Sequence, residues 1–304
     1  MRTCRRHFLS LRSISNLHHQ HLTKMKEYRM SSMPRGICVI FNNMDFEEHN
    51  KKNVKPHLDY RRGSEKDEDS LKNVFSWLGF TVKVHRDKRA KEMKDLLKKV
   101  SQTDHVGDCF VCCILSHGCP DGVYGTDGGV VLSDDIFGPF GGRVCPSLAG
   151  KPKVFFIQAC RGNDYQRRVE VQADSMAADR DEDEEDEEFE MDTAQMITIP
   201  NDGDFLVARS TVKGFVSVRN PLSGTWFIQS LCEQLRNNCP KCKDVQSILI
   251  CVNEEVSKKI ATMQINYGIA KVKQEVKQMP VQKVTLRKTL VFRVPSSAQI
   301  SSPS

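Results

Sequence analysis

The chain has 304 residues, of which 39% are hydrophobic, and a formal net charge of +6. This length allows one large domain or two small ones. No apolar run approaches the ~20 residues needed to cross a bilayer, so a membrane-spanning protein is excluded. Twelve cysteines invite a disulfide interpretation. However, several lie inside apolar runs, and no signal-peptide core is present, so we expect reduced thiols and a cytoplasmic protein.

The charge is unevenly distributed. Residues 179–192 contain eleven acids and one Arg, so they carry −10, and the rest of the chain carries about +16 by subtraction. Such a basic body would suit nucleic acid, but no basic surface interleaved with aromatics is apparent, so we expect no nucleic-acid partner. Residues 1–33 are basic and have no acid before Glu27. That composition is typical of a mitochondrial transit peptide, but without a clear amphipathic helix a disordered basic segment is favoured.

From Gly36 onward, short apolar strands alternate with helical periodicity. The expected strands are 37–41, 80–84, 109–115, 154–157, 215–218 and 290–292, and the expected helical faces are 71–78, 93–100, 228–235 and 245–256. The alternation predicts a layered α/β domain with a largely parallel sheet. The acidic block at 179–192 interrupts it, and a block of like charges is expected to form a hydrated loop rather than a folded element.

Two candidate catalytic residues directly follow apolar strands. Cys160 lies within Gln158-Ala159-Cys160-Arg161-Gly162 and His117 within Ser116-His117-Gly118. An imidazole beside a thiol activates it as a nucleophile, which is the chemistry of a cysteine peptidase. The backbone N–H groups of Gly118 and Cys160 are the expected donors to the oxyanion. The alternative is that each residue is structural, but the combination of two strand ends and a specific pentapeptide favours catalysis.

These motifs, with Tyr124-Gly125-Thr126-Asp127-Gly128, Arg219-Asn220-Pro221 and Gly224-Thr225-Trp226-Phe227-Ile228-Gln229-Ser230, resemble the caspase family, especially its initiator members. The resemblance extends over residues 34–294. It implies a three-layer sandwich with a six-stranded, mostly parallel sheet and helices on both faces. It also implies cleavage after Asp, without a cofactor, and an apoptotic function.

The resemblance further implies a primary pocket made by Arg61, Gln158 and Arg219, which would hold the substrate carboxylate. Arginine suits this function because its planar fork binds a carboxylate bidentately. Read without the family, Arg61 would be a solvated neighbour of Arg62. Asn220 and Trp226 match positions that line the outer subsites. Val218 stands where initiator relatives have an aromatic, which leaves the preference two residues before the cleaved Asp open.

By the same resemblance, the chain divides into a large subunit at 34–174, a linker at 175–192 that self-cleavage after Asp174 and Asp192 removes, and a small subunit at 193–304. Family members form homodimers through the last strands of the small subunits, and Leu290-Val291-Phe292 is the expected edge. Residues 257–277 are expected to form an enlarged surface loop or an extra helix. Cys239-Pro240-Lys241-Cys242 is a single pair, so no metal site is assigned.

Two further expectations concern partners. The chain has no room for tandem death-effector domains, so recruitment to a death-receptor adaptor is not expected. The rival function is a catalytically silent relative that dimerises with an active caspase and regulates it. His117, Cys160 and Arg219 are all present, which favours an enzyme, because silent relatives usually lack one of them.

Overall fold

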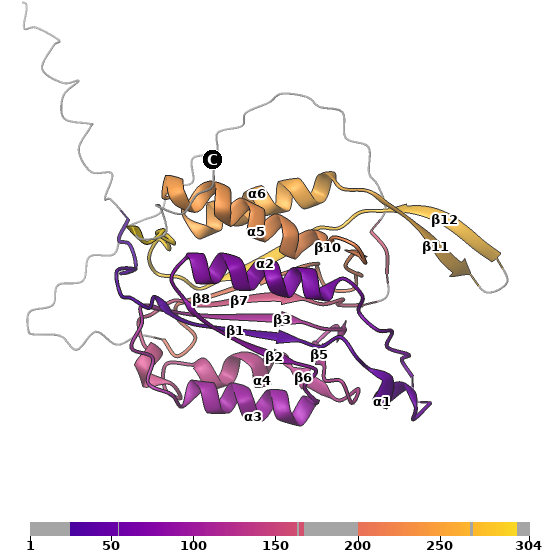
Figure 1. The fold of residues 1–304 in the computed structure, drawn as a ribbon, viewed down its shortest axis with the longest axis horizontal. Coiled ribbons are helices and arrows are strands. Elements are labelled where there is room, and N and C mark those ends of the chain that lie inside the picture. Colours follow the sequence, from indigo (N-terminus) through magenta and orange to yellow (C-terminus); the bar gives the residue numbers. More distant parts are fainter. Residues whose placement is uncertain (1–24, 54, 163, 167–199, 268–269, 297–304) are drawn as a thin grey trace, which may run out of the picture.

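A computed structural model describes residues 25–53, 55–162, 164–166, 200–267 and 270–296 (Figure 1). Its centre is a six-stranded sheet in the order β13-β8-β7-β3-β1-β2. These strands are β1 (Gly36–Asn42), β2 (Thr81–Arg86), β3 (Cys109–Leu115), β7 (Lys153–Gln158), β8 (Phe205–Arg209) and β13 (Val281–Val284). Only β13 runs antiparallel to its neighbour in this sheet. The predicted six-stranded, mostly parallel sheet is therefore confirmed.

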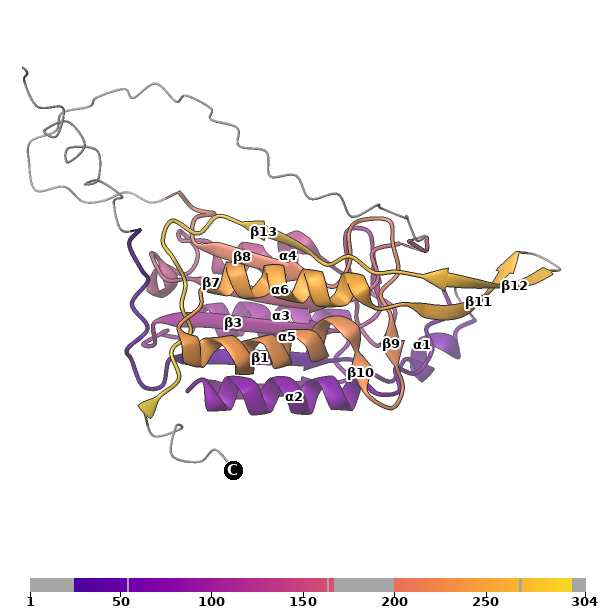
Figure 2. The ribbon, with the colours of Figure 1, turned by 90° about the horizontal axis from the view of Figure 1, so that it is seen from above.

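Helices cover both faces of the sheet (Figures 1 and 2). On one side lie α2 (Ser64–Trp77), α5 (Trp226–Asn238) and α6 (Val245–Lys258), and on the other lie α3 (Ala90–Ser101) and α4 (Ser133–Phe137). The core divides accordingly, because successive side chains of a strand point to opposite faces. On β1, Cys38 and Ile40 join the first cluster, whereas Val39 and Phe41 join the second. Burial on both faces of the sheet explains why β3 is an uninterrupted apolar run and why residues 154–157 of β7 are all apolar.

Smaller elements surround one end of this sheet. They comprise α1 (Glu47–Asn50), the three-stranded sheet β4 (Gly118–Cys119), β5 (Gly122–Tyr124) and β6 (Val130–Leu132), the pair β9 (Arg219–Asn220) and β10 (Gly224–Thr225), and the hairpin β11 (Ala261–Tyr267) and β12 (Ala270–Val276). Three 3₁₀ turns complete the described elements, at Gly138–Phe140, Pro146–Leu148 and Cys239–Lys241. Among the described residues, no helix has the length and apolarity that a bilayer span requires.

Two predicted strands are wrong. Phe215 forms only an isolated bridge with Asp164, and the residues that follow it up to Val218 are irregular. Leu290-Val291-Phe292 is not a strand and not an edge, because its side chains are buried at 1%, 4% and 1% exposure. The Phe292 ring packs edge-on against Phe75 and Phe80. A continuous apolar triplet can be buried by helices as well as by a sheet, which is why this prediction failed.

The segments expected to be irregular are also more ordered than predicted. Residues 261–267 and 270–276 pair as the two strands of the hairpin β11–β12, and neither is a loop or a helix. At the N-terminus, Tyr28 and Met30 are buried at 4% and 5% exposure, and Glu27 bridges to Thr289. The expectation that all of residues 1–33 are disordered is therefore wrong for the part from Glu27 onward, while residues 1–24 lie outside the described residues.

Candidate active site

The two predicted catalytic residues lie at the same end of the sheet because β3 and β7 are parallel neighbours. Leu115 pairs with Gln158, and the Ser116 N–H donates to the Gln158 carbonyl at 3.1 Å. His117 follows the first strand and Cys160 the second. Gly118 approaches so closely that a Cβ there would lie 2.5 Å from the Cys160 carbonyl oxygen. The sheet therefore brings together two residues that are far apart in sequence, and only a glycine fits beside them.

A backbone carbonyl orients the imidazole of His117. Its Nε2 lies 2.7 Å from the carbonyl oxygen of Asp59, and its ring packs edge-on against Phe46 at 4.9 Å between centroids. A carbonyl can only accept, so the proton is on Nε2 and the neutral ring keeps Nδ1 as an acceptor. Burial lowers the pKa of His117 from 6.5 to about 4, with a further lowering from Arg61 and Arg219. At neutral pH the ring is therefore a free base.

The sulfur of Cys160 lies in a partly exposed position beside Ser217. The Ser217 N–H is 3.4 Å from Sγ, and the Ser217 hydroxyl is 3.9 Å from it. Cys112 and Cys113 are fully buried in β3, and burial raises the pKa of both far above the ordinary value. Such thiols behave as inert core residues.

Three polar side chains gather beside this pair: Arg61 from the segment before α2, Gln158 from the end of β7 and Arg219 from β9. Arg61 is 1% exposed, and its Nη1 donates to the Asn43 carbonyl at 3.0 Å and to the Ser64 hydroxyl at 2.8 Å. Burial, followed by the like charge of Arg219, lowers the pKa of Arg61 to about 9. Gln158 is buried; its Nε2 donates to the Ser217 hydroxyl at 2.7 Å, while its Oε1 has no partner. The two guanidinium groups are suited to an anionic side chain, and the Gln158 Nε2 is a further hydrogen-bond donor beside them.

The outer residues lie where the hairpin β9–β10 meets α5. Asn220 is exposed on β9, and Trp226 is the half-buried first residue of α5. Val218 is buried with Val276 in a small apolar cluster that also contacts Trp226. The predicted outer residues Asn220 and Trp226 therefore lie close to Arg219, together with Val218. The predicted cleavage positions, Asp174 and Asp192, lie outside the described residues.

Sequence reasoning missed the carbonyl of Asp59 and the hydroxyl of Ser217. The first is a main-chain group, so no residue type could have marked it. The second belongs to an irregular segment that was predicted as a strand. A serine in such a segment gives no signal on its own.

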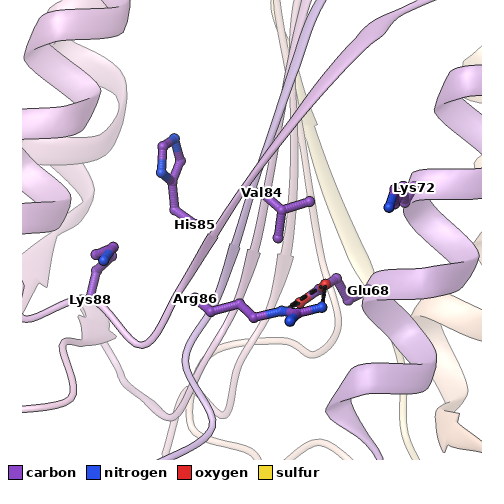
Figure 3. A pocket seen from close by; sticks show the side chains of 6 residues that line it. All are labelled: Glu68, Lys72, Val84, His85, Arg86 and Lys88. Atoms are coloured by element: carbon purple, nitrogen blue, oxygen red, sulfur yellow. Dashed lines mark hydrogen bonds and ion pairs between the residues drawn. The ribbon is translucent and has the colours of Figure 1, made fainter.

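A separate cavity of about 470 Å³ lies at the open edge of β2 and does not include the Cys160 region (Figure 3). Its lining is polar, and Arg86 pairs with Glu68 across it, with Nε 3.0 Å from Oε1. In the described part of the chain, no group of three His, Cys, Asp or Glu residues could hold a metal ion. Cys239 and Cys242 flank the 3₁₀ turn after α5, and only Cys242 is exposed.

Comparison with known proteins gives a consistent result. Residues 35–291 match the family described as Caspase domain. Rat caspase-8 is 42% identical over 267 residues, which cover 87% of this chain and 52% of the relative. Human caspase-10 is 39% identical over 70% of this chain and 38% of the relative. The crystal structure of caspase-1 from Spodoptera frugiperda superposes with a TM-score of 0.73 at 30% identity, over 90% of this chain and 95% of that one.

These similarities define the class, which is that of the proteins with a Caspase domain and its layered α/β fold. The chain belongs to the caspase family and is similar to caspase-8. It spans about half the length of the caspase-8 relatives that it matches.

Proposed function

We propose that this chain is a cysteine endopeptidase that cleaves proteins after Asp and acts in the cytoplasm, in apoptotic signalling. The observation that carries the proposal is the group of Arg61, Gln158 and Arg219 beside Cys160. Burial lowers the pKa of both arginines, so each guanidinium bears a desolvation cost that an incoming carboxylate would offset. A neutral side chain would leave these groups unpaired, which favours Asp by a factor of about 10⁴.

The catalytic steps follow from the two strand ends. His117 accepts the thiol proton, and the Cys160 sulfur attacks the backbone carbonyl carbon of the bound Asp. The N–H groups of Gly118 and Cys160 stabilise the oxyanion. His117 then returns the proton to the leaving amine, which gives a thioester with Cys160. Water, deprotonated by the same imidazole, hydrolyses the thioester and regenerates the thiol. The Asp59 carbonyl keeps the ring in the required tautomer during both stages.

The test uses an acetylated tetrapeptide that ends in Asp before a fluorogenic amine. The expected result is release of the amine by the wild type and none above background by Cys160→Ala. Cys251→Ala is the matched control, because Cys251 is also half-exposed but lies on α6, and it should keep full activity. Equal signals from the wild type and Cys160→Ala would reject the proposal that the chain is a cysteine endopeptidase. An inactive wild type that binds an active caspase would favour the silent regulator instead.

Activation is proposed to follow the initiator pattern, with dimerisation and self-cleavage after Asp174 and Asp192. Support comes from the sheet. The large part, 34–174, contributes β7, and the small part, 193–304, contributes β8, its parallel neighbour. Five residue pairs from Lys153↔Phe205 to Ile157↔Arg209 join them, so the two parts would stay associated after the chain is cut. Mass spectrometry of the incubated chain should find new N-termini at Ser175 and Thr193, and Cys160→Ala should remain uncut. An active enzyme with an intact linker would reject this route.

A further inference from the structure

Asp67 is a buried carboxylate that the catalytic steps above do not use. It lies in the first half of α2 and is 0% exposed. Its neighbours on the same helix differ, since Asp69 is exposed and Glu68 pairs with Arg86. Burying an ionised carboxylate is costly unless the surroundings compensate for the charge. The position of Asp67 therefore calls for a specific partner.

Its hydrogen bonds reach the hairpin that carries Arg219. Oδ1 accepts from the Thr225 N–H at 2.9 Å and from Gln229 Nε2 at 2.8 Å. Thr225 is the cross-strand partner of Arg219 in the pair β9–β10. Gly224 has a φ of +94°, and a Cβ there would lie 2.4 Å from Asp67 Oδ1. The carboxylate thus fits into a space that glycine leaves open, and it fixes the residue opposite Arg219.

The charge of Asp67 acts on both arginines of the pocket. It raises the pKa of Arg61 and of Arg219, against the lowering that burial causes in each. Cys160, Asp59 and Glu65 also raise the pKa of Arg219, but Cys160 is half-exposed and the two carboxylates are exposed, and exposed charges are well screened. Asp67 is therefore the buried negative charge that faces two positive ones. The three together leave one net positive charge for a substrate side chain.

We propose that Asp67 is the resident counter-ion of the primary pocket: it holds Arg61 and Arg219 charged and in place while no substrate is bound. It is a positioning residue, and the proposal rests on the proposed function. The substrate carboxylate would bind the same two guanidinium groups. Asp67 and the substrate are therefore two negative charges in one pocket, and they repel each other. Asp67 therefore stabilises the empty pocket and lowers its affinity for a ligand with a carboxylate.

The experiment compares the wild type with Asp67→Asn and the matched control Asp69→Asn. Asparagine keeps a carbonyl oxygen for the Thr225 N–H but removes the charge. Thermal melting is followed with and without a tetrapeptide aldehyde that ends in aspartic aldehyde. Asp67→Asn should melt lower than Asp69→Asn without ligand, yet bind the aldehyde about tenfold more tightly than the wild type does, because one like charge is gone.

Two outcomes would contradict the proposal that Asp67 is the counter-ion of the pocket. One is an aldehyde affinity of Asp67→Asn that equals or falls below that of the wild type, which would mean a purely structural hydrogen bond. The other concerns Arg61→Gln/Asp67→Asn, which restores the charge balance and should melt higher than Asp67→Asn alone. A lower melting temperature contradicts the proposal, and if Asp67→Asn does not fold, so does a double variant that also fails to fold. A wild type that the aldehyde does not stabilise would instead reject the proposed function.

Discussion

Arg61 and Arg62 are adjacent in sequence, yet only one belongs to the site. Arg61 is 1% exposed, whereas Arg62 is exposed to solvent. Gly63, with φ +87°, turns the chain into α2, and a Cβ there would lie 2.7 Å from the Asn220 carbonyl oxygen. This close contact brings the start of α2 against the hairpin of Arg219. The functional difference between the two arginines is therefore set by the backbone around Gly63.

The first prediction follows from this difference. Arg61→Gln should lower kcat/KM for an Asp-ended peptide by about 10³-fold, because a buried charged donor to the substrate carboxylate is lost. Arg62→Gln is the matched control and should change kcat/KM by less than about threefold, as expected for an exposed charge. Steady-state kinetics with the fluorogenic peptide measures both. Similar losses in the two variants would contradict the assignment of Arg61 to the pocket.

The second prediction concerns the protonation of His117. Its pKa of about 4 is due first to burial, and Arg61 and Arg219 lower it further. NMR titration of the ring, assigned with His117→Gln, should give a midpoint near 4 in the free protein. The midpoint should rise when an Asp-ended aldehyde offsets the arginine charges. A midpoint near 6.5 in the free protein would show that the ring is solvated instead.

The same shift has a consequence for stability. The folded-state pKa of His117 lies below the unfolded value of 6.5. The unfolded chain therefore takes up this proton first as the pH falls. The contribution of the neutral, buried ring to the free energy of unfolding is fully present above about pH 6.5 and is lost progressively toward pH 4.

Sequence predicted the candidate site unevenly. Cys160 and His117 could be located because each lies just past the end of an apolar strand, whereas the pocket role of Gln158 came from the family resemblance. Arg61 came only from family resemblance, since its local sequence is that of a surface loop. Asp67 lies in the run Glu65-Lys66-Asp67-Glu68-Asp69, which is typical of a solvated helix face. Its burial depends on a hairpin more than 150 residues away in the chain, and no local pattern records that contact.

At the level of elements, the segment before β1 is held to the C-terminal part of the chain. The Tyr28 hydroxyl donates to Asp204 Oδ1 at 2.6 Å and accepts from the Arg287 N–H at 2.9 Å. Arg287 also pairs with Asp204, with Nη2 2.9 Å from Oδ2. Asp204 directly precedes β8, so this network ties three distant segments to one edge of the sheet. Burial raises the pKa of Tyr28, so its hydroxyl keeps its proton.

The third prediction tests this network. Tyr28→Phe should lower the free energy of unfolding by about 1–3 kcal/mol, because the buried Asp204 loses a donor and the Arg287 N–H loses its acceptor. Urea denaturation measures the change. The matched control is Tyr60→Phe, since Tyr60 is 53% exposed, and it should be within about 0.5 kcal/mol of the wild type. Equal stability of the two variants would mean that the segment is not anchored through Tyr28.

The elements that the sequence predicted well are those whose hydrophobic residues form a clear helical period or an apolar run. Strands β1, β2, β3 and β7 and helices α2, α3, α5 and α6 were all expected near their observed positions. Strand β13 was missed because Val281-Gln282-Lys283-Val284 is short and half-polar, as is typical of an edge strand. The apolar triplet Leu290–Phe292 was preferred instead, although helices bury it. Hydrophobicity marks burial, and it does not say which kind of element provides the burial.

On the scale of the whole molecule, the six-stranded sheet has two open edges, β2 and β13. The proposed dimer joins the small subunits through a final strand, and β13 is that strand in this fold, in place of Leu290–Phe292. Arg161 and Gln282 each have a buried polar atom without a partner near this edge, and both line one cavity there with Arg209. These two atoms are buried within the chain, so β13 is inferred to be the contact edge from its open backbone edge.

The last prediction uses the direction of the backbone groups on β13. The Thr285 N–H donates to the Phe205 carbonyl at 2.8 Å. In an antiparallel pair, alternate residues face the partner strand, so the N–H of Gln282 points away from β8, toward the open edge. Gln282→Pro removes this outward donor without breaking the ladder to β8, as edge positions of this kind tolerate proline. It should abolish dimerisation, and with it most of the activity at low protein concentration.

Gln282→Ala is the control, because it shortens the side chain but keeps the N–H, and it should dimerise like the wild type. Sedimentation velocity gives the oligomeric state, and the dependence of specific activity on protein concentration gives the functional effect. A Gln282→Pro variant that folds and still dimerises would exclude β13 as the contact edge. Activity of that variant as a monomer would reject dimerisation as the activating step, while leaving the Asp-directed chemistry of Cys160 and His117 in place.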